Sequence, residues 1–129
     1  MKTRQATASA YPLLHAGQGF QLGHDAIEFC QGTFSEMNED IYEMIEYFVK
    51  RKKVLYVHFR NVSGQVPKFY EEFVNTGYVD MYRAMRTYFD NGFDGFFIDD
   101  HVPHTFQDTP FGHRGRAHAM GYIDRKSVV

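Results

Sequence analysis

The hydrophobic and polar positions of this chain follow two periods, one typical of helices and one typical of buried strands. The helical period is clearest over residues 41–53, where apolar residues recur three and four positions apart and so share one face. Residues 33–40 supply acidic and cap-forming side chains before this segment, and the basic run 51–53 suits a helix C-terminus. The pattern predicts an amphipathic helix whose buried face is formed by Ile41, Met44, Ile45, Phe48 and Val49.

A second helix is predicted from the same spacing. Asp80 suits the N-cap position, and the Asn-Gly pair at 91–92 supplies a C-terminal stop. The buried face of this helix is expected to comprise Met81, Ala84, Met85, Tyr88 and Phe89. A last helix is predicted around 116–124.

Three short apolar runs, at 26–32, 53–62 and 94–100, read as strands. The second run is hydrophobic on both faces, which predicts a parallel sheet covered on both sides. Strands and helices therefore alternate, which indicates an α/β fold. Residues 63–79 make a connection longer than a minimal turn, and we expect a loop of the kind that is often functional.

Composition and charge narrow the class of protein. The chain has 129 residues, 43% of them hydrophobic, which is enough for one packed domain. A formal net charge of -2 gives no broad basic surface for nucleic acid, and no apolar stretch is long enough to cross a bilayer. No continuous apolar segment near the start reads as a signal peptide, and the single cysteine suits a reducing compartment. We expect a cytoplasmic protein.

Chemically active residues stand at the C-terminal end of each predicted strand. Cys30 ends the first, His58 and Arg60 end the second, and Asp100 and His101 end the third. Barrels and open α/β sheets place their functional sites at this edge. The same strand parity puts His58 on the side of Val54 and Tyr56.

Each of these residues also has an ordinary structural interpretation. A buried cysteine is commonly a small core residue, Arg60 can pair with a carboxylate at a neighbouring strand end, and Asp100 can be a solvated loop residue. Together, a thiolate, an imidazole and a carboxylate form a mixed ligand set that suits a divalent transition metal. The other histidines have weaker arguments: His104, His113 and His118 lie in loops or helices, and His15 and His24 fall outside the strand pattern.

Several motifs together resemble the C-terminal part of the D-mannonate dehydratases. In chain order these are EFCQGT, YVHFRNV, VDMYRAM, GFDGFFIDDH and TPFGHRGRAHAMGY. The resemblance implies a partial (β/α)8 TIM barrel of the xylose-isomerase-like type, with about three C-terminal βα units over 24–129. Residues 1–23 are expected to be an irregular N-terminal segment. The activity implied is a metal-dependent lyase that dehydrates D-mannonate to 2-keto-3-deoxy-D-gluconate in hexuronate catabolism.

The resemblance also assigns roles by position. It implies that Cys30, His58 and Asp100 are ligands of Mn²⁺ or Fe²⁺, and that His101 is the acid/base group. Arg60 and Asn61 are expected to bind substrate oxygens or to order the ligand shell. His113 is the second catalytic candidate, because some relatives have a tyrosine close to its position and an imidazole can also transfer a proton. Val102 stands where many relatives have glycine.

The resemblance covers only the C-terminal part of the family's sequence. The N-terminal half of the family, with a further histidine ligand and substrate-binding residues, has no counterpart here, so we expect this chain to be a fragment. Its expected partners are the small sugar acid D-mannonate and either further copies of the chain or a separate N-terminal half. Two alternatives stay open: an inactive remnant, and a related metal-dependent sugar isomerase or epimerase.

Overall fold

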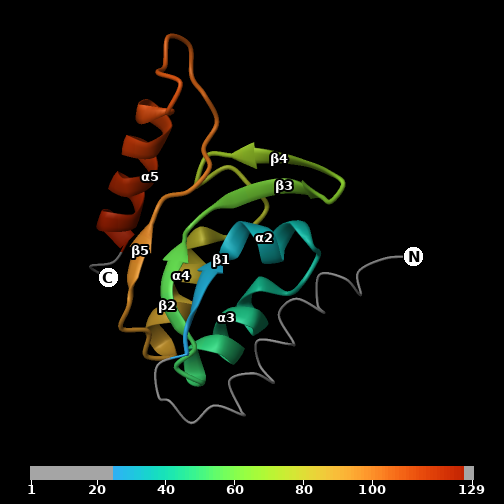
Figure 1. Cartoon of the computed structure of the whole chain (residues 1–129), viewed down its shortest axis with the longest axis vertical. Coiled ribbons are helices and arrows are strands. Elements are labelled where there is room, and N and C mark those ends of the chain that lie inside the picture. Colours follow the sequence, from blue (N-terminus) through green and yellow to red (C-terminus); the bar gives the residue numbers. More distant parts are fainter. Residues whose placement is uncertain (1–24, 127–129) are drawn as a thin grey trace.

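A three-stranded parallel sheet forms the centre of the protein. The computed structural model describes residues 25–126 (Figure 1), so the expectations for 1–23 and for His15 and His24 lie outside the described residues. The strands are β1 (Ile27–Cys30), β2 (Val54–His58) and β5 (Phe96–Ile98), with β2 in the middle. Their parallel pairing confirms the α/β class predicted from the sequence.

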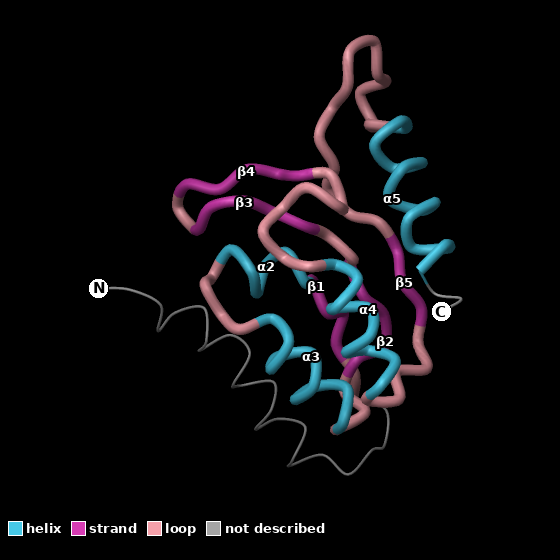
Figure 2. The backbone as a smooth tube through the Cα atoms, turned by 180° about the vertical axis from the view of Figure 1, so that it is seen from behind, coloured by secondary structure: helices cyan, strands magenta, loops and turns pink. Residues whose placement is uncertain are grey.

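Helices α3 (Ile41–Lys50) and α4 (Met81–Asp90) pack side by side on one face of this sheet, in front of the strands in Figure 2. We call this the helix face; its strand residues are Phe29, Val57 and Phe97. Nearly all of the predicted helix residues are buried there, the exceptions being the partly buried Met44 and the exposed Phe89. The core thus consists of strand residues and two amphipathic helices, as the periodicity predicted.

Both helices begin at an aspartate. The Asp80 side chain accepts a hydrogen bond from the backbone N–H of Arg83 at 3.0 Å, which confirms the predicted cap of α4. The Asp40 side chain accepts from Tyr42 and Glu43 at the start of α3. These carboxylates satisfy backbone donors that the first helical turn leaves unpaired.

The opposite side of the sheet, which we call the site face, carries Glu28, Tyr56, His58 and Phe96. No helix of the described part of the chain covers it, and Phe96 is 57% exposed, so the prediction of a sheet covered on both sides is wrong here. The predicted strand parity is also wrong, because the pairing of β1 with β2 is irregular. The pairing shifts between Ile27 and Glu28, and the buried Val54 therefore lies in the core while His58 does not, contrary to their predicted shared parity.

The expected loop after β2 is instead a β-hairpin. Strands β3 (Asn61–Gln65) and β4 (Lys68–Glu72) pair antiparallel around a turn at Val66 and Pro67, whose peptide bond is cis. Gly64 has a positive φ of 82°, which only glycine adopts readily. In Figure 1 the hairpin extends away from the sheet beyond the C-terminal ends of the strands.

A short helix, α2 (Gln31–Glu36), follows β1 directly. The first strand ends at Cys30, as predicted, and the last two residues of the apolar run 26–32 already belong to α2. Part of the segment that was expected only to precede a helix is therefore itself helical. Gly32 is required by close packing, because a Cβ atom there would lie 2.7 Å from Cδ of Arg60. The glycine leaves room for that arginine to cross the start of α2.

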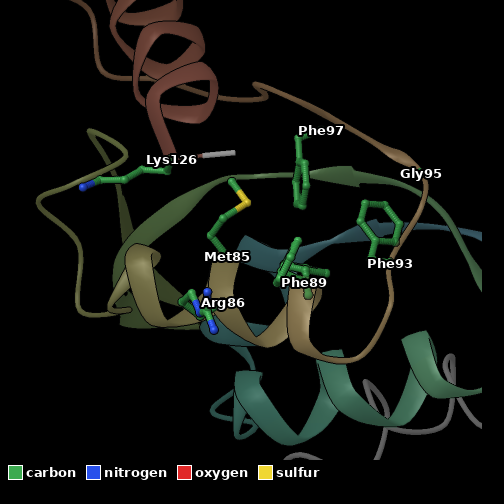
Figure 3. Close-up of a pocket in the computed structure, with 8 residues that line it drawn as sticks. Met85, Arg86, Phe89, Phe93, Gly95, Phe97 and Lys126 are labelled. Carbon is green, nitrogen blue, oxygen red and sulfur yellow. The ribbon is translucent and has the colours of Figure 1, made fainter. Parts of the chain in front are cut away.

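The last helix, α5 (His113–Lys126), begins earlier and ends later than the predicted 116–124. Its C-terminal end helps to line a cavity of about 150 Å³ with α4 and the segment before β5 (Figure 3). Phe97, a helix-face residue, lines this cavity, and none of the predicted site residues does. Within 25–126, no helix is long and apolar enough to cross a membrane.

Candidate metal centre

Three side chains from three strand ends meet at the C-terminal edge of the sheet. Cys30 is the last residue of β1, His58 is the last residue of β2, and Asp100 follows β5 by two residues. One potential ligand atom from each side chain lies within 4.8 Å of the others, and all three residues are half-buried. Parallel pairing explains the convergence, because Cys30 and His58 are register partners and Ile98 is the partner of His58 on the other side.

The spacing of these atoms fits a small divalent ion. Oδ2 of Asp100 lies 3.6 Å from Nδ1 of His58 and 3.7 Å from Sγ of Cys30. Two ligand atoms that each lie about 2.0–2.3 Å from a tetrahedral ion are roughly 3.3–3.8 Å apart. Sulfur, nitrogen and oxygen donors in one set suit transition metals and not Mg²⁺ or Ca²⁺. The donor set therefore fits a transition-metal ion in its chemistry, and both distances from Asp100 lie in the range that such an ion needs.

Two further groups contact these three side chains. Glu28 lies on the site face with Oε1 2.7 Å from Nδ1 of His58, and its other oxygen accepts a 2.5 Å hydrogen bond from the Tyr56 hydroxyl. The Thr33 hydroxyl lies 3.0 Å from the Cys30 sulfur. The hydrogen bond from the Tyr56 hydroxyl to Glu28 is the main reason why the pKa of Tyr56 lies above its ordinary value.

Arg60 is buried, and its contacts are internal. Its guanidinium donates to Glu71 through Nε at 2.7 Å and Nη2 at 2.5 Å, and Nη2 also reaches Glu36 at 3.1 Å. Nη1 lies 3.8 Å from the Cys30 sulfur, and Nε lies 4.0 Å from Asp100. The structural alternative, pairing with carboxylates, is what the structure contains, and substrate binding by Arg60 stays a prediction.

The charges around Arg60 act on one another. Burial alone would lower the pKa of Arg60, but the hydrogen bonds and charge of Glu71 outweigh burial and raise it. Glu36 differs: burial raises its pKa above the ordinary value, and the attraction of Arg60 only partly offsets that effect. Arg60 therefore stays charged beside the cluster, and Glu71 is its principal partner.

Asn61 is engaged entirely by the backbone. Its amide nitrogen donates to the carbonyl oxygens of Val74 and Val79, at 3.1 and 3.0 Å. Its oxygen accepts from the N–H groups of Val62 and Val79. An asparagine side chain offers two donors and two acceptor positions, so all of them are used. Of the two roles expected for Asn61, ordering the ligand shell agrees with these contacts, whereas binding substrate would require some of them to break.

The two catalytic candidates lie in different places. His101 is next to the cluster: Nε2 lies 3.9 Å from Asp100, Nδ1 lies 3.3 Å from Glu71, and the side chain is 67% exposed. The described contacts of His113 are with Thr109 and Phe111 at the start of α5, and none involves the three clustered residues. A catalytic role for His113 stays a prediction that these contacts do not favour.

The described contacts of His118 and His104 also lie outside the cluster. Nε2 of His118 lies 2.8 Å from Oδ1 of Asn75, and its ring packs on Phe73. That contact fixes α5 against the segment after β4. His104 lies in the loop before α5, near Gly112.

Sequence reasoning missed four residues around the cluster: Glu28, Thr33, Glu36 and Glu71. Glu28 had a usable signal, because it lies two positions before Cys30 and so points to the same side of the strand. Glu71 had none, because its approach depends on a hairpin that the pattern did not predict.

Comparison with known proteins decides the family. A family profile described as D-mannonate dehydratase (UxuA) matches residues 18–126, most of the chain. The chain belongs to the D-mannonate dehydratase family. This confirms the resemblance inferred from the motifs.

Individual relatives agree with this assignment. The mannonate dehydratase of Lactococcus lactis subsp. lactis (strain IL1403) is 38% identical over 84 residues, which cover 60% of this chain and 23% of the relative. That of Thermotoga maritima is 29% identical over 82 residues, with the same coverage of both chains. The chain thus spans about a quarter of the length of these curated relatives.

A solved structure supports the fold. The crystal structure of mannonate dehydratase from Streptococcus suis serotype 2 matches with a TM-score of 0.76 and 24% identity, over 84% of this chain and 33% of that one. At this identity the match supports the fold alone. The α/β arrangement of the described residues therefore has a counterpart in a mannonate dehydratase.

Proposed function

We propose that this chain supplies the C-terminal, metal-holding part of a D-mannonate dehydratase, a carbon–oxygen lyase that converts D-mannonate to 2-keto-3-deoxy-D-gluconate in the cytoplasm. The convergence of Cys30, His58 and Asp100 at three strand ends is the observation that carries this proposal. Family membership supports it. In the same proposal, the three parallel strands are consecutive units of a (β/α)8 barrel, and the site face points to its interior.

The metal is proposed to be Mn²⁺ or Fe²⁺, held by the Cys30 thiolate, an imidazole nitrogen of His58 and a carboxylate oxygen of Asp100. When bound, a divalent ion stabilises negative charge that develops on substrate oxygens. Arg60 places a positive charge 3.8 Å from the Cys30 sulfur, on the side of the cluster that faces the hairpin. Asn61 holds the end of β2 to the segment 74–79 and so keeps the ligand edge in shape.

His101 is the proposed proton-transferring group. Dehydration of a sugar acid requires removal of the proton next to the carboxylate and protonation of the departing hydroxyl. Nε2 of His101 lies on the side of Asp100 and in a largely exposed ring, so it can reach a substrate at the cluster. A positioned acid or base of this kind contributes typically about 10²- to 10⁴-fold to the rate.

The test is reconstitution of the activity. The chain would be loaded with Mn²⁺ or Fe²⁺, alone and after co-expression with the N-terminal three quarters of the Lactococcus lactis relative, and 2-keto acid formation from D-mannonate would be followed. We expect turnover only in the co-expressed complex. Asp100→Ala should abolish both metal binding and turnover, whereas His101→Ala should lower kcat by at least about 10²-fold with metal content near normal.

Other outcomes would replace the proposal. A complex that binds metal but isomerises or epimerises a sugar would be a related isomerase. A complex that holds no metal and turns over nothing would be an inactive remnant. Loss of metal in His101→Ala would make His101 a ligand and remove its acid/base role.

A further inference from the structure

Glu71 is held in one orientation by a buried arginine. Both of its oxygens accept hydrogen bonds from Arg60, at 2.7 Å and 2.5 Å, in the bidentate geometry that fixes a carboxylate most strictly. The Arg60 side chain is only 5% exposed. It also donates a hydrogen bond to Glu36, and its methylene groups pack closely against Gly32. The hairpin therefore presents Glu71 to the edge of the metal centre with little rotational freedom.

His101 lies between this carboxylate and the clustered residues. Its Nδ1 is 3.3 Å from Oε1 of Glu71, and its Nε2 is 3.9 Å from Oδ1 of Asp100. Both carboxylates can only accept hydrogen bonds, but Glu71 lies within hydrogen-bonding distance of the ring and Asp100 does not. A neutral His101 ring is therefore expected to carry its one proton on Nδ1, facing Glu71. In the neutral ring, the lone pair is then on Nε2, toward Asp100.

We propose that Glu71 is the positioning residue of His101: it holds the proton on Nδ1 and leaves Nε2 free to accept a proton from substrate. A base oriented by a third group is a recurring feature of proton-transferring sites. The inference rests on the proposed role of His101 and adds the hairpin to the active centre. It assigns the connection between β2 and α4 a specific purpose.

A purely structural role for Glu71 makes a different prediction. If Glu71 served only to neutralise Arg60, the tautomer of His101 would not depend on it, and an exposed imidazole would follow its intrinsic preference for a proton on Nε2. The two accounts therefore differ in a spectroscopic property that requires neither metal nor substrate.

The experiment is a tautomer measurement on the whole chain labelled with ¹⁵N-histidine. Long-range ¹H–¹⁵N correlation spectra would be recorded at about pH 8.5, above the ordinary range of imidazole titration, with the His101 signals assigned from His101→Gln. We expect His101 of the unaltered chain to be protonated mainly on Nδ1. In Glu71→Gln, the single amide oxygen should stay with Arg60 while the NH₂ group faces His101, so the proton should move mainly to Nε2.

The hairpin offers a matched control. Glu72 is the next residue, and its oxygens contact Ser63 at 2.6 Å and Thr76 at 3.1 Å. Glu72→Gln removes the same charge from the same strand and should leave the His101 tautomer unchanged. His118, which lies beside Asn75, is an internal reference that neither variant should shift.

Two results would overturn the proposal: a His101 protonated mainly on Nε2 in the unaltered chain, or a folded Glu71→Gln variant with the original tautomer. If Glu71→Gln does not fold, Glu71→Asp keeps an anion for Arg60 but withdraws it from His101, and an unchanged tautomer there would count against the proposal. Turnover of D-mannonate is not part of this readout. Absence of turnover would reject the proposed function without touching the role of Glu71, and turnover with an unaltered tautomer in Glu71→Gln would reject only Glu71.

Discussion

The two faces of the three-stranded sheet differ in what completes them. On the helix face, Phe29 and Val57 are fully buried by α3 and α4, which follow the strands in the sequence. On the site face, the alternate strand residues Glu28 and Phe96 are exposed, and the half-buried His58 belongs to the cluster of Cys30, His58 and Asp100. Within the described residues, helices therefore bury the helix face, whereas the site face stays accessible to solvent. Residues 25–126 supply all the elements that bury the helix face, but they supply only part of what surrounds the site face.

The largest change in stability should come from removing a large buried side chain from the helix face. Phe29 is wholly buried and contacts the rings of Phe34, Phe48 and Tyr88. Phe29→Ala should lower the free energy of unfolding by about 3–5 kcal/mol, because it leaves a cavity in a close-packed core. Urea unfolding followed by far-UV circular dichroism measures this.

The matched control is Phe96→Ala on the site face. Phe96 is 57% exposed, and within residues 25–126 its described ring contact is a stack on Tyr56, at 5.3 Å. Its loss should cost less than about 1.5 kcal/mol. Equal costs for the two variants would break the comparison, since they would mean that the site face is buried in solution, for instance by a second copy of the chain.

The second effect concerns metal affinity. His58→Ala should raise the dissociation constant for Mn²⁺ by at least about 10²-fold, because one of three protein donors is lost. The free energy of unfolding of the metal-free chain should fall by no more than about 1 kcal/mol, because His58 lies outside the apolar core and its partner Glu28 is exposed. Calorimetric titration with Mn²⁺ measures the affinity.

His118→Ala is the control for that experiment, because it removes an imidazole whose contacts are Asn75 and Phe73. Its affinity for Mn²⁺ should match that of the unaltered chain. If His58→Ala binds Mn²⁺ as tightly as the unaltered chain, the ion lies elsewhere and the cluster is not the metal site.

The third prediction concerns the stability that Asn61 contributes at the start of the hairpin, next to the end of β2. Removing its amide in Asn61→Ala leaves the carbonyl oxygens of Val74 and Val79 without their partner, so we expect a loss of about 1–3 kcal/mol of stability. Asn75→Ala, which removes an exposed amide from the same connection, should cost less than about 1 kcal/mol. A folded Asn61→Ala variant with full stability would return Asn61 to the list of substrate-binding candidates.

How much of this the sequence could predict follows the same division. The helices α3 and α4 were predicted to within a few residues, and Asp80 was predicted as a cap, because each signal is local and periodic. The convergence of Cys30, His58 and Asp100 was also predictable, since parallel strands bring their C-terminal ends to one edge. These results need only the order of the elements.

The hairpin and its contribution were not predictable in the same way. Gly64 and Pro67 are ordinary loop signals, and β4 places the exposed Tyr70 between half-buried neighbours without a strong apolar alternation. What supports the hairpin is tertiary: Arg60 holds Glu71, and Ser63 holds Glu72. Contacts of this kind depend on register across the turn, which the sequence pattern does not contain.

The smallest predicted effect is on the pH dependence of stability, through the charge of Glu36 in α2 beside Arg60. Burial raises the pKa of Glu36 more than Arg60 lowers it, so the folded chain binds that proton more tightly than the unfolded chain does. A raised pKa contributes stability that is present below the ordinary value of 4.5 and is lost as the pH rises through the folded-state value. The ionised Glu36 at neutral pH is thus a cost to the fold.

Glu36→Gln removes that cost, so its stability relative to the unaltered chain should improve between about pH 4.5 and pH 7, by no more than about 1 kcal/mol. Urea midpoints at the two pH values, with metal removed by a chelator, give the difference. Glu43→Gln, which removes an exposed charge from α3, is the control for charge alone. If Glu36→Gln instead loses stability relative to the unaltered chain as the pH rises, the pairing with Arg60 outweighs desolvation. The site side would then resemble the helix face, in that its buried groups would stabilise the fold on their own.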